Sequence, residues 1–223
     1  MVLTPIVLIC GDAPLPLPLG SINATRVPAL PEKDDFDEAF SKLQVVPEPR
    51  LIVVGDDAAF AATLTRLMRT DRLHIELAYV SEHSTAGTDA YRLATGAKAA
   101  KAALEGKAKS VPLIRDDAGI ALVGAATLEG PEGEKLVGEA YADDSLLFSG
   151  TTRQVTIVPS HRMPGVRTAA APRWRWLPHK WLEGRAVQLG SPAAMLTRDG
   201  VRNPRPLKRS TFYRHDEEWL LVR

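Results

Sequence analysis

Apolar and polar positions in the first half of the chain follow two different periods. Short apolar runs and strict alternation predict strands, whereas apolar residues three and four apart predict helices. The strand candidates are 5–10, 51–54 and 74–80, and the helix candidates are 34–43, 57–69 and 87–105. Strands separated by helices in this way favour a parallel sheet with helices on its faces.

Beyond residue 110 the pattern changes to short apolar runs broken by Gly, Pro and Asp, without the spacing of an amphipathic helix. The runs are 120–128, 134–141, 145–148, 153–158, 185–189, 193–197 and 218–222. Such runs are typical of an antiparallel β-sandwich or an open barrel. The sequence therefore predicts an α/β domain over 1–110, with a mainly parallel sheet, and an antiparallel β-sandwich domain over 111–223.

The composition is that of an ordinary globular protein, with 45% hydrophobic and 25% charged residues. The single cysteine, Cys10, cannot form an internal disulfide and suits a reducing compartment. No apolar run approaches the roughly 20 residues that span a bilayer. The first ten residues, MVLTPIVLIC, lack the basic start of a signal peptide. We therefore expect a cytoplasmic protein, and peripheral contact with a membrane is compatible with this expectation.

The net charge of +1 conceals an uneven distribution of charge. Residues 1–152 carry 14 Lys/Arg against 22 Asp/Glu, whereas residues 153–215 carry 13 Lys/Arg against two acids. A basic segment suggests an anionic partner, such as phosphate, a membrane surface or nucleic acid. Basic residues scattered over a solvated face explain the excess equally well.

The first candidate site is the turn of Gly55, Asp56 and Asp57, which follows the run 51–54 and precedes a helix. A helix N-terminus presents unpaired N–H groups and a partial positive charge, so this turn could bind phosphate. Asp56 could hold a bridging Mg²⁺, whereas Asp57 adds a charge that repels phosphate. Either aspartate could instead cap the helix, and the residues alone favour that interpretation.

A second turn of the same kind lies in the segment SEHSTAGTDAYRL, between a predicted strand and a predicted helix. Ser84, Thr85 and Gly87 offer hydroxyls and a flexible backbone just before the helix begins. They could form a second phosphate cradle, or they could simply cap the helix.

Three of the four tryptophans occur in the segment APRWRWLPHKWLEGR. Trp174, Trp176 and Trp181 alternate there with basic residues, among them Arg173 and Arg175. This mixture suits an anionic membrane interface or another ligand surface, and it could also stack on nucleic-acid bases. The indoles could instead fill a junction between the two domains.

Asp199 and Gly200 form a further candidate, near the C-terminal end of the basic segment. Asp-Gly is above all a signal for a hairpin turn. A carboxylate held at such a turn could also act as a general base on an alcohol.

Taken in order, these segments resemble the catalytic family of diacylglycerol kinases, which includes bacterial lipid kinases and sphingosine kinases. The segment VGDDA at 54–58 stands where that family has GGDGT, and STAGT at 84–88 stands where it has PxGTxND. Asp199-Gly200 stands at the family's DGE-like turn, and RPLKRSTFYRHDEEWLLVR resembles its closing strands.

The resemblance implies a two-domain fold, and ATP and Mg²⁺ as cofactors of an active member. The implied nucleotide-binding residues are Gly55, Asp56, Asp57, Ser84 and Thr85. Asp56 is the implied metal ligand and Asp199 the implied base. The first turn lacks two of the family's three glycines and its threonine. The second turn lacks the proline, glycine and asparagine of the family pattern.

These departures lead us to prefer a non-catalytic or weakly active relative that binds a lipid or a metabolite. The alternative is an active ATP-dependent kinase that phosphorylates a lipid hydroxyl. A nucleic-acid-binding protein that uses the basic segment is a more distant alternative.

Overall fold

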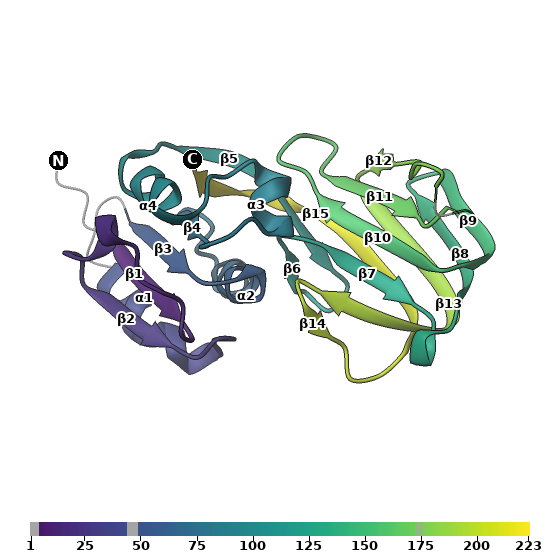
Figure 1. The fold of residues 1–223 in the computed structure, drawn as a ribbon, viewed down its shortest axis with the longest axis horizontal. Helices are drawn as coiled ribbons and strands as arrows, with labels where there is room; N and C mark the ends of the chain where they lie inside the picture. Colours follow the sequence, from purple (N-terminus) through teal and green to yellow (C-terminus); the bar gives the residue numbers. More distant parts are fainter. Residues whose placement is uncertain (1–4, 44–48, 173, 175) are drawn as a thin grey trace. The chain divides into compact units, whose positions relative to one another are not determined.

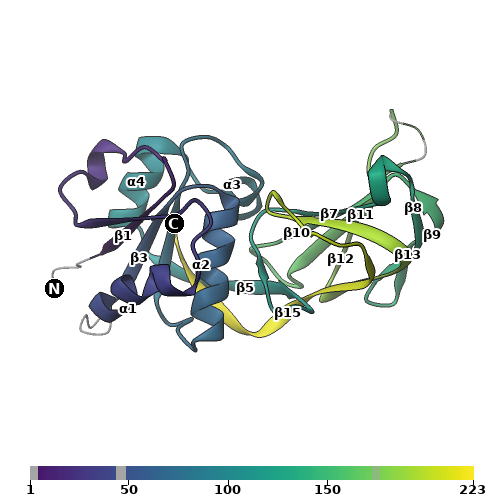
Figure 2. The same ribbon diagram turned by 90° about the horizontal axis from the view of Figure 1, so that it is seen from below.

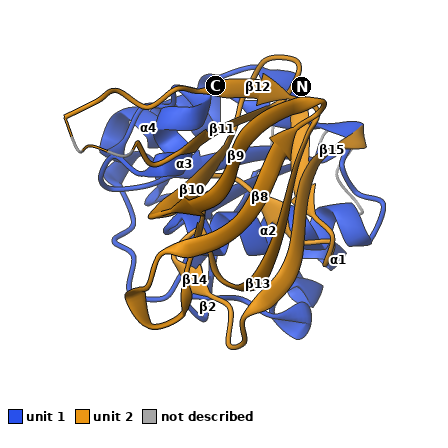
Figure 3. Cartoon of the chain, turned by 90° about the vertical axis from the view of Figure 1, so that its right-hand side faces the viewer, with its two compact units in different colours: residues 1–111, 217–223 blue, residues 112–216 orange. Residues whose placement is uncertain are grey.

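The structure is a computed structural model that describes residues 5–43, 49–172, 174 and 176–223 (Figure 1). The chain divides into two compact units, which Figure 3 colours separately. The first unit is Met1–Val111 with Glu217–Arg223, and the second is Pro112–Asp216. The chain passes from one unit to the other in β5 (Ala108–Asp116) and again in β15 (Leu207–Val222).

The units differ from the predicted domains at the C-terminus. Residues 217–223, which the prediction places in the second domain, group with the first unit. They form the end of β15, where Leu221 pairs with Leu77. No described helix combines the length and the hydropathy that a membrane crossing requires.

A parallel sheet forms the centre of the first unit. Its strands are β1 (Ile6–Cys10), β2 (Ala24–Val27), β3 (Arg50–Val54) and β4 (Glu76–Val80). They pair in the order β2–β1–β3–β4, and the end of β15 adds a further parallel partner to β4. β1 and β3 are buried at every position, as in strands that are covered on both faces.

Helices cover both faces of this sheet. They are α1 (Asp37–Leu43), α2 (Asp57–Arg69), α3 (Ala86–Tyr91) and α4 (Gly96–Glu105), with the 3-10 turns η1 (Leu17–Leu19) and η2 (Lys33–Phe36). α4 packs its alanines, among them Ala100, in one cluster with Ala78 and Val80. Successive strand residues point to opposite faces, so Tyr79 lies on the other face. There Phe60 of α2 stacks on Tyr79, with ring centroids 4.4 Å apart. Figure 2 shows the helices α2 and α4 beside the strands of this sheet.

The prediction of one helix over 87–105 is wrong, because two helices, α3 and α4, occupy this segment. Arg92 ends α3 in the left-handed conformation, with φ at 56°, and Gly96 begins α4 at φ 57°. The Gly96 N–H donates to the Ser81 carbonyl over 2.7 Å, which ties the break to the end of β4. The alanine spacing continues across the break, so it gave no sign of the left-handed residue.

The second unit consists of strands. Besides β5 and β15, these are β6 (Ala121–Leu122), β7 (Ala126–Glu129), β8 (Leu136–Ala142), β9 (Ser145–Thr152), β10 (Gln154–Pro159), β11 (Val166–Ala170), β12 (Leu182–Gly184), β13 (Ala186–Arg198) and β14 (Val201–Arg202), with the 3-10 turn η3 (Pro131–Gly133). β7, β10, β11 and β12 pair antiparallel in a row. β8 and β9 form a separate antiparallel pair.

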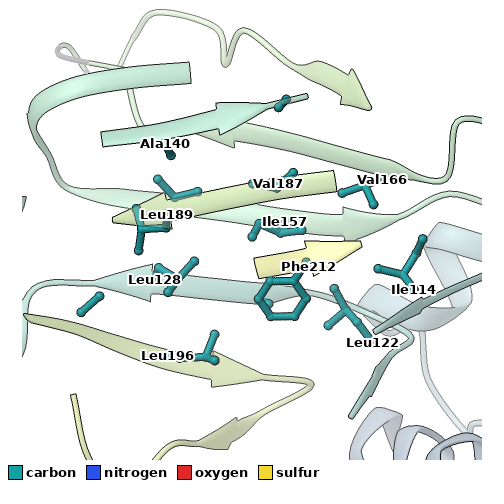
Figure 4. Packing of buried hydrophobic residues seen from close by; sticks show 14 of the residues in the cluster. Ile114, Leu122, Leu128, Ala140, Ile157, Val166, Val187, Leu189, Leu196 and Phe212 are labelled. Atoms are coloured by element: carbon teal, nitrogen blue, oxygen red, sulfur yellow. The ribbon is translucent and has the colours of Figure 1, made fainter. Parts of the chain in front are cut away.

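The long strand β13 belongs to both groups of strands. Its first part pairs with β8 and β15, and its last part pairs with β7 and β14. The register shifts between Gly190 and Ala194, so the predicted runs 185–189 and 193–197 form one irregular strand. Leu128, Val187 and Phe212 contribute to a core that draws side chains from both groups (Figure 4). The predicted fold class, an α/β unit followed by an antiparallel β unit, is confirmed.

Candidate functional site

A pocket of about 640 Å³ lies in the first unit, at the carboxyl ends of three strands. Cys10, Val54 and Val80 are the last residues of β1, β3 and β4, and all three line this pocket. β1 lies between β2 and β3, so the chain leaves it toward one side and returns on the other. Ligands of parallel α/β sheets bind at such switch points, outside the carboxyl ends of the strands.

The wall of this pocket is mostly apolar, with carboxylates at its exposed parts. Leu17 is 95% exposed and stands in the wall with Val54 and Val80. Asp12, Asp56 and Glu82 each come from a different strand end, and all three are exposed. Among the described residues that line the pocket there is no Lys or Arg.

Gly55 and Asp56 form part of this wall, and each has a structural role. A Cβ added to Gly55 would lie 3.0 Å from the Cβ of Cys10 and 3.3 Å from that of Ala59, so packing favours glycine there. Asp56 is the N-cap of α2, and its Oδ1 accepts the Ala59 N–H over 2.9 Å. Asp56 is nevertheless exposed, so its carboxylate can also contact a ligand in the pocket.

Asp57 joins the two predicted turns to each other. Its Oδ1 accepts the Tyr79 hydroxyl over 2.9 Å and the Thr85 hydroxyl over 2.7 Å. Its Oδ2 accepts the Gly87 N–H over 3.0 Å. A Cβ on Gly87 would lie 2.5 Å from Oδ1, so glycine is required for this approach. Asp57 is therefore engaged with the protein, and it is not among the residues that line the pocket.

Two titratable groups of the first unit, Tyr79 and Cys10, are held in their neutral form. Burial, and then the charge of Asp57, raises the pKa of Tyr79 well above its usual range. Burial raises the pKa of Cys10 to about 12, with smaller contributions from Asp56 and Asp35. Cys10 is therefore a thiol at neutral pH and not a nucleophile.

Of the candidate residues in the second turn, one lines the pocket and one lies on the surface outside it. Thr85 lines the pocket, donates to Asp57 and accepts the Thr88 N–H over 3.1 Å as the N-cap of α3. Ser84 is exposed and donates to Asp89 over 2.8 Å, outside the pocket lining. The structure thus places Gly55, Asp56 and Thr85 together in the pocket wall and leaves Ser84 outside it.

Asp199 lies in the second unit and is bound by backbone amides. It is only 8% exposed, and its Oδ1 accepts the N–H groups of Gly124 at 2.7 Å and Ala125 at 3.1 Å. Its Oδ2 accepts the Val123 N–H at 3.2 Å. The residue has a φ of 46° and its own N–H donates to the Ala125 carbonyl over 2.9 Å. This arrangement fixes the connection between β6 and β7.

The tryptophan-rich segment joins β11 to β12 in the second unit. Trp174, Trp176 and Trp181 are 56%, 79% and 39% exposed. Arg173 and Arg175, predicted as part of the same surface, lie outside the described residues.

Several pocket residues were absent from the sequence-based candidates. Gly11 and Asp12 follow β1, and Leu17 belongs to the proline-spaced segment after it. The run 5–10 was predicted as a strand, so the rule that sites form at strand ends could have found Gly11 and Asp12. No pattern in the sequence indicates that the segment containing Leu17 folds back over the same pocket.

No family model matches this sequence, and no curated protein matches it either. Solved structures do match its backbone. One is described as a diacylglycerol kinase from Bacillus anthracis, with a TM-score of 0.68, 11% identity and coverage of 98% of this chain and 96% of that one. Another is an NAD kinase from Archaeoglobus fulgidus in complex with ATP, with a TM-score of 0.55, 10% identity and coverage of 98% and 93%.

The chain therefore has the fold seen in the diacylglycerol kinase of Bacillus anthracis and, less closely, in the NAD kinase of Archaeoglobus fulgidus. The likeness spans nearly the whole chain and confirms, at the level of the fold, the resemblance seen in the sequence. At 10–11% identity it rests on the backbone and carries no residue-by-residue correspondence.

Proposed function

We propose that this chain is a diacylglycerol kinase-like protein with an eroded ATP site. It binds a lipid or a metabolite in the pocket of the first unit and transfers phosphate weakly or not at all. The observation that carries the proposal is the pocket wall, which presents Asp12, Asp56 and Glu82 and no Lys or Arg among its described residues.

Electrostatics oppose a triphosphate at such a wall. Phosphoryl transfer depends on cations that neutralise the phosphate oxygens and on backbone that approaches them closely. Like charges about 4 Å apart repel by roughly 1 kcal/mol in water and about 4 kcal/mol near a protein surface. Three exposed carboxylates without a Lys or Arg in the wall thus fit the charge of a triphosphate poorly.

The dimensions and chemistry of the pocket suit a different ligand. Small-molecule sites usually enclose about 300–1,000 Å³ and have mainly apolar walls with a few polar groups. This pocket, at about 640 Å³, lies within that range and is walled largely by Leu17, Val54, Val80 and prolines. An uncharged metabolite or the glycerol end of a lipid would meet no repulsion from the three carboxylates.

The second candidate function is an active ATP-dependent lipid kinase. The exposed carboxylate of Asp56 favours it, because in the pocket wall it could hold a Mg²⁺ that bridges to phosphate oxygens. ATP and Mg²⁺ would be the cofactors of such an enzyme, as the ATP complex of the NAD kinase neighbour suggests. Asp199 would have to act as the base, although three backbone N–H groups already occupy its carboxylate.

Thermal unfolding with millimolar MgATP, adenosine or dioctanoylglycerol distinguishes the two functions. A ligand at 100 times its Kd stabilises the folded state by about 2.7 kcal/mol. We expect MgATP to leave the transition unchanged and at least one uncharged ligand to raise it. Ala97→Trp, which fills the pocket, should abolish that rise, whereas Ser149→Trp on an exposed strand should not.

The active-kinase alternative predicts the opposite pattern. MgATP would stabilise the chain, Asp56→Ala would remove the effect, and radiolabelled ATP would phosphorylate diacylglycerol. Any of these three results would overturn the proposal of an eroded ATP site.

A further inference from the structure

The segment 172–181, between β11 and β12, exposes more large apolar surface than its length would suggest. Trp174, Trp176, Leu177 and Trp181 are 56%, 79%, 36% and 39% exposed. Indoles usually bury most of their surface, and clustered exposed apolar side chains mark interaction sites. The fourth tryptophan, Trp219, shows the usual behaviour, because it is 1% exposed in the core of the first unit.

Trp181 packs on polar neighbours, and its ring is not part of the core cluster of the second unit. The Arg167 guanidinium lies over the Trp181 ring at 5.0 Å, and the His179 ring lies 6.4 Å from that of Trp181. None of the three indoles belongs to the core cluster between the strands.

Basic side chains accompany these indoles. Lys180 is exposed, and no ion pair holds it among the described residues. Arg153 is exposed and donates to the Pro172 carbonyl over 3.3 Å, at the start of the segment. Of the nearby acids, Glu183 is paired with Arg167 at 3.4 Å. Cationic side chains thus accompany the indoles within this segment and at its start.

A small polar pocket of about 380 Å³ adjoins the base of the segment. Its wall includes the cations of Lys135 and Arg153 and the imidazole of His179, together with the carboxylates of Glu129 and Glu134. A wall with both signs of charge suits a phosphate group that carries a polar substituent. It offers much less to a neutral apolar ligand.

The irregular backbone of the segment also suits a hydrated, polar environment. It contains no strand or helix among its described residues, and Pro172 and Pro178 have no N–H to donate. Lipid-exposed irregular backbone is excluded from the hydrocarbon region, but the headgroup region supplies water and polar partners. Tryptophan prefers this same region, and each Lys or Arg near an anionic surface adds to the attraction.

We propose that the indoles of this segment, together with Lys180 and Arg153, form a docking surface for an anionic phospholipid bilayer. Trp174, Trp176 and Trp181 enter the headgroup region, while Lys180 and Arg153 contact lipid phosphates. This surface lies within the second unit and is independent of what the pocket of the first unit binds.

Tryptophan fluorescence of the full chain tests the proposal directly. Vesicles with 30% phosphatidylglycerol in phosphatidylcholine should shift the emission to the blue, and brominated acyl chains should quench it. Pure phosphatidylcholine vesicles should have a much smaller effect. Trp219, being buried, should contribute a constant background.

Variants locate the contact on the chain. Each of Trp176→Ala and Trp181→Ala should weaken partition into anionic vesicles by about tenfold, the loss expected for one partly buried indole. Lys180→Gln should weaken it about fivefold on anionic vesicles and hardly at all on neutral ones. Leu30→Ala, at a position 48% exposed in the first unit, is the matched control and should bind as the wild type does.

Three results would overturn the proposal. The first is an emission spectrum that anionic vesicles neither shift nor quench. The second is equal partition of the wild type and the double variant Trp176→Ala/Trp181→Ala, with both shown to be folded by circular dichroism. The third is salt-sensitive binding to a single-stranded oligonucleotide without binding to vesicles, which would assign the surface to nucleic acid.

Discussion

Two turns of this chain carry an aspartate beside a glycine, and the structure uses them in opposite ways. In the β3–α2 turn, Asp56 is exposed, accepts one helix N–H and stands in the wall of a pocket. In the β13–β14 turn, Asp199 is 8% exposed and accepts three backbone N–H groups. The residue type is the same, but Asp56 has an extended backbone with φ at −103° and Asp199 a left-handed one with φ at 46°. Backbone conformation, burial and partners therefore separate a carboxylate available to a ligand from one that holds a loop.

Asp199→Ala should give the largest loss of stability, about 4 kcal/mol. The change leaves the N–H groups of Val123, Gly124 and Ala125 without their acceptor, at about 1–3 kcal/mol for each buried group. It also places alanine at a φ of 46°, which costs about 1 kcal/mol more. Chemical denaturation measures the loss, and the thermal transition should fall by roughly 10 °C.

Asp199→Asn is the control for this loss, because asparagine tolerates the left-handed conformation and keeps one acceptor oxygen. It should recover about half of the stability. A loss below about 1 kcal/mol for Asp199→Ala would contradict the structural role and would leave the residue open as a base.

Asp57→Ala comes next, with an expected loss of about 3 kcal/mol. It removes the acceptor of the Tyr79 hydroxyl, the Thr85 hydroxyl and the Gly87 N–H together. The pKa of Tyr79 should also fall, because the charge of Asp57 is the second cause of its elevation. It should stay above the ordinary value, since burial is the first cause. Tyrosinate absorbance during an alkaline titration checks this, with Tyr79→Phe to identify the band.

Gly87→Ala tests the contact between Asp57 and Gly87 by changing the glycine. It should lower the free energy of unfolding by about 2 kcal/mol. Its Cβ would lie 2.5 Å from the Oδ1 of Asp57, so the carboxylate must move and lose its partners. Alanine otherwise stabilises helices relative to glycine, which makes a net loss diagnostic of the clash. Gly190→Ala is the control, because a Cβ there meets nothing within 4 Å. Equal stability of the two variants would refute the close approach seen in the structure.

Local periodicity explains which parts of the fold the sequence could predict. The helix predicted over 57–69 is α2, because its apolar face, its acidic start and its end all lie within one short segment. The break at Arg92 escaped prediction because a left-handed arginine leaves no trace in the spacing of alanines. The return of β15 to the first unit depends on Leu221 pairing with Leu77, a distant contact that no local pattern encodes.

The residues of the candidate site also include some that the sequence could predict and some that it could not. Gly55, Asp56 and Thr85 were predictable because strand-to-helix turns at the carboxyl edge of a parallel sheet converge. The role of Asp57 was not predictable, since its partners lie 22, 28 and 30 residues away in the sequence. The sequence showed a carboxylate that would repel phosphate, whereas the structure shows one already surrounded by donors.

Asp56→Ala should cost only about 1 kcal/mol, the usual effect of losing an N-cap. The contrast with Asp199→Ala is the sharpest test of the two turns, because both changes remove a carboxylate. Asp56→Asn should be nearly neutral, since asparagine caps as well as aspartate does. Denaturation curves of the three variants give the comparison. A loss for Asp56→Ala as large as that for Asp199→Ala would mean that both turns are structural.

Cys10 should add an alkaline slope to the stability, an effect that is absent at neutral pH. Its pKa is raised to about 12 in the folded state by burial and then by Asp56 and Asp35, against about 9 for an exposed thiol. Between these values the folded state holds the proton that the unfolded state has lost. Stability therefore falls as pH rises, by at most about 1.4 kcal/mol per pH unit, and the contribution is complete below pH 9.

Denaturation of the wild type, Cys10→Ala and Cys10→Ser between pH 8 and 10 isolates this slope, since neither substitute titrates there. Both variants should show a flatter profile than the wild type. Asp56→Asn should flatten it slightly as well, because a carboxylate in the pocket wall contributes to the elevation. Parallel plots of stability against pH for the wild type and the Cys10 variants would contradict the raised pKa of Cys10. They would mean that water from the pocket reaches the thiol more than its 5% exposure indicates.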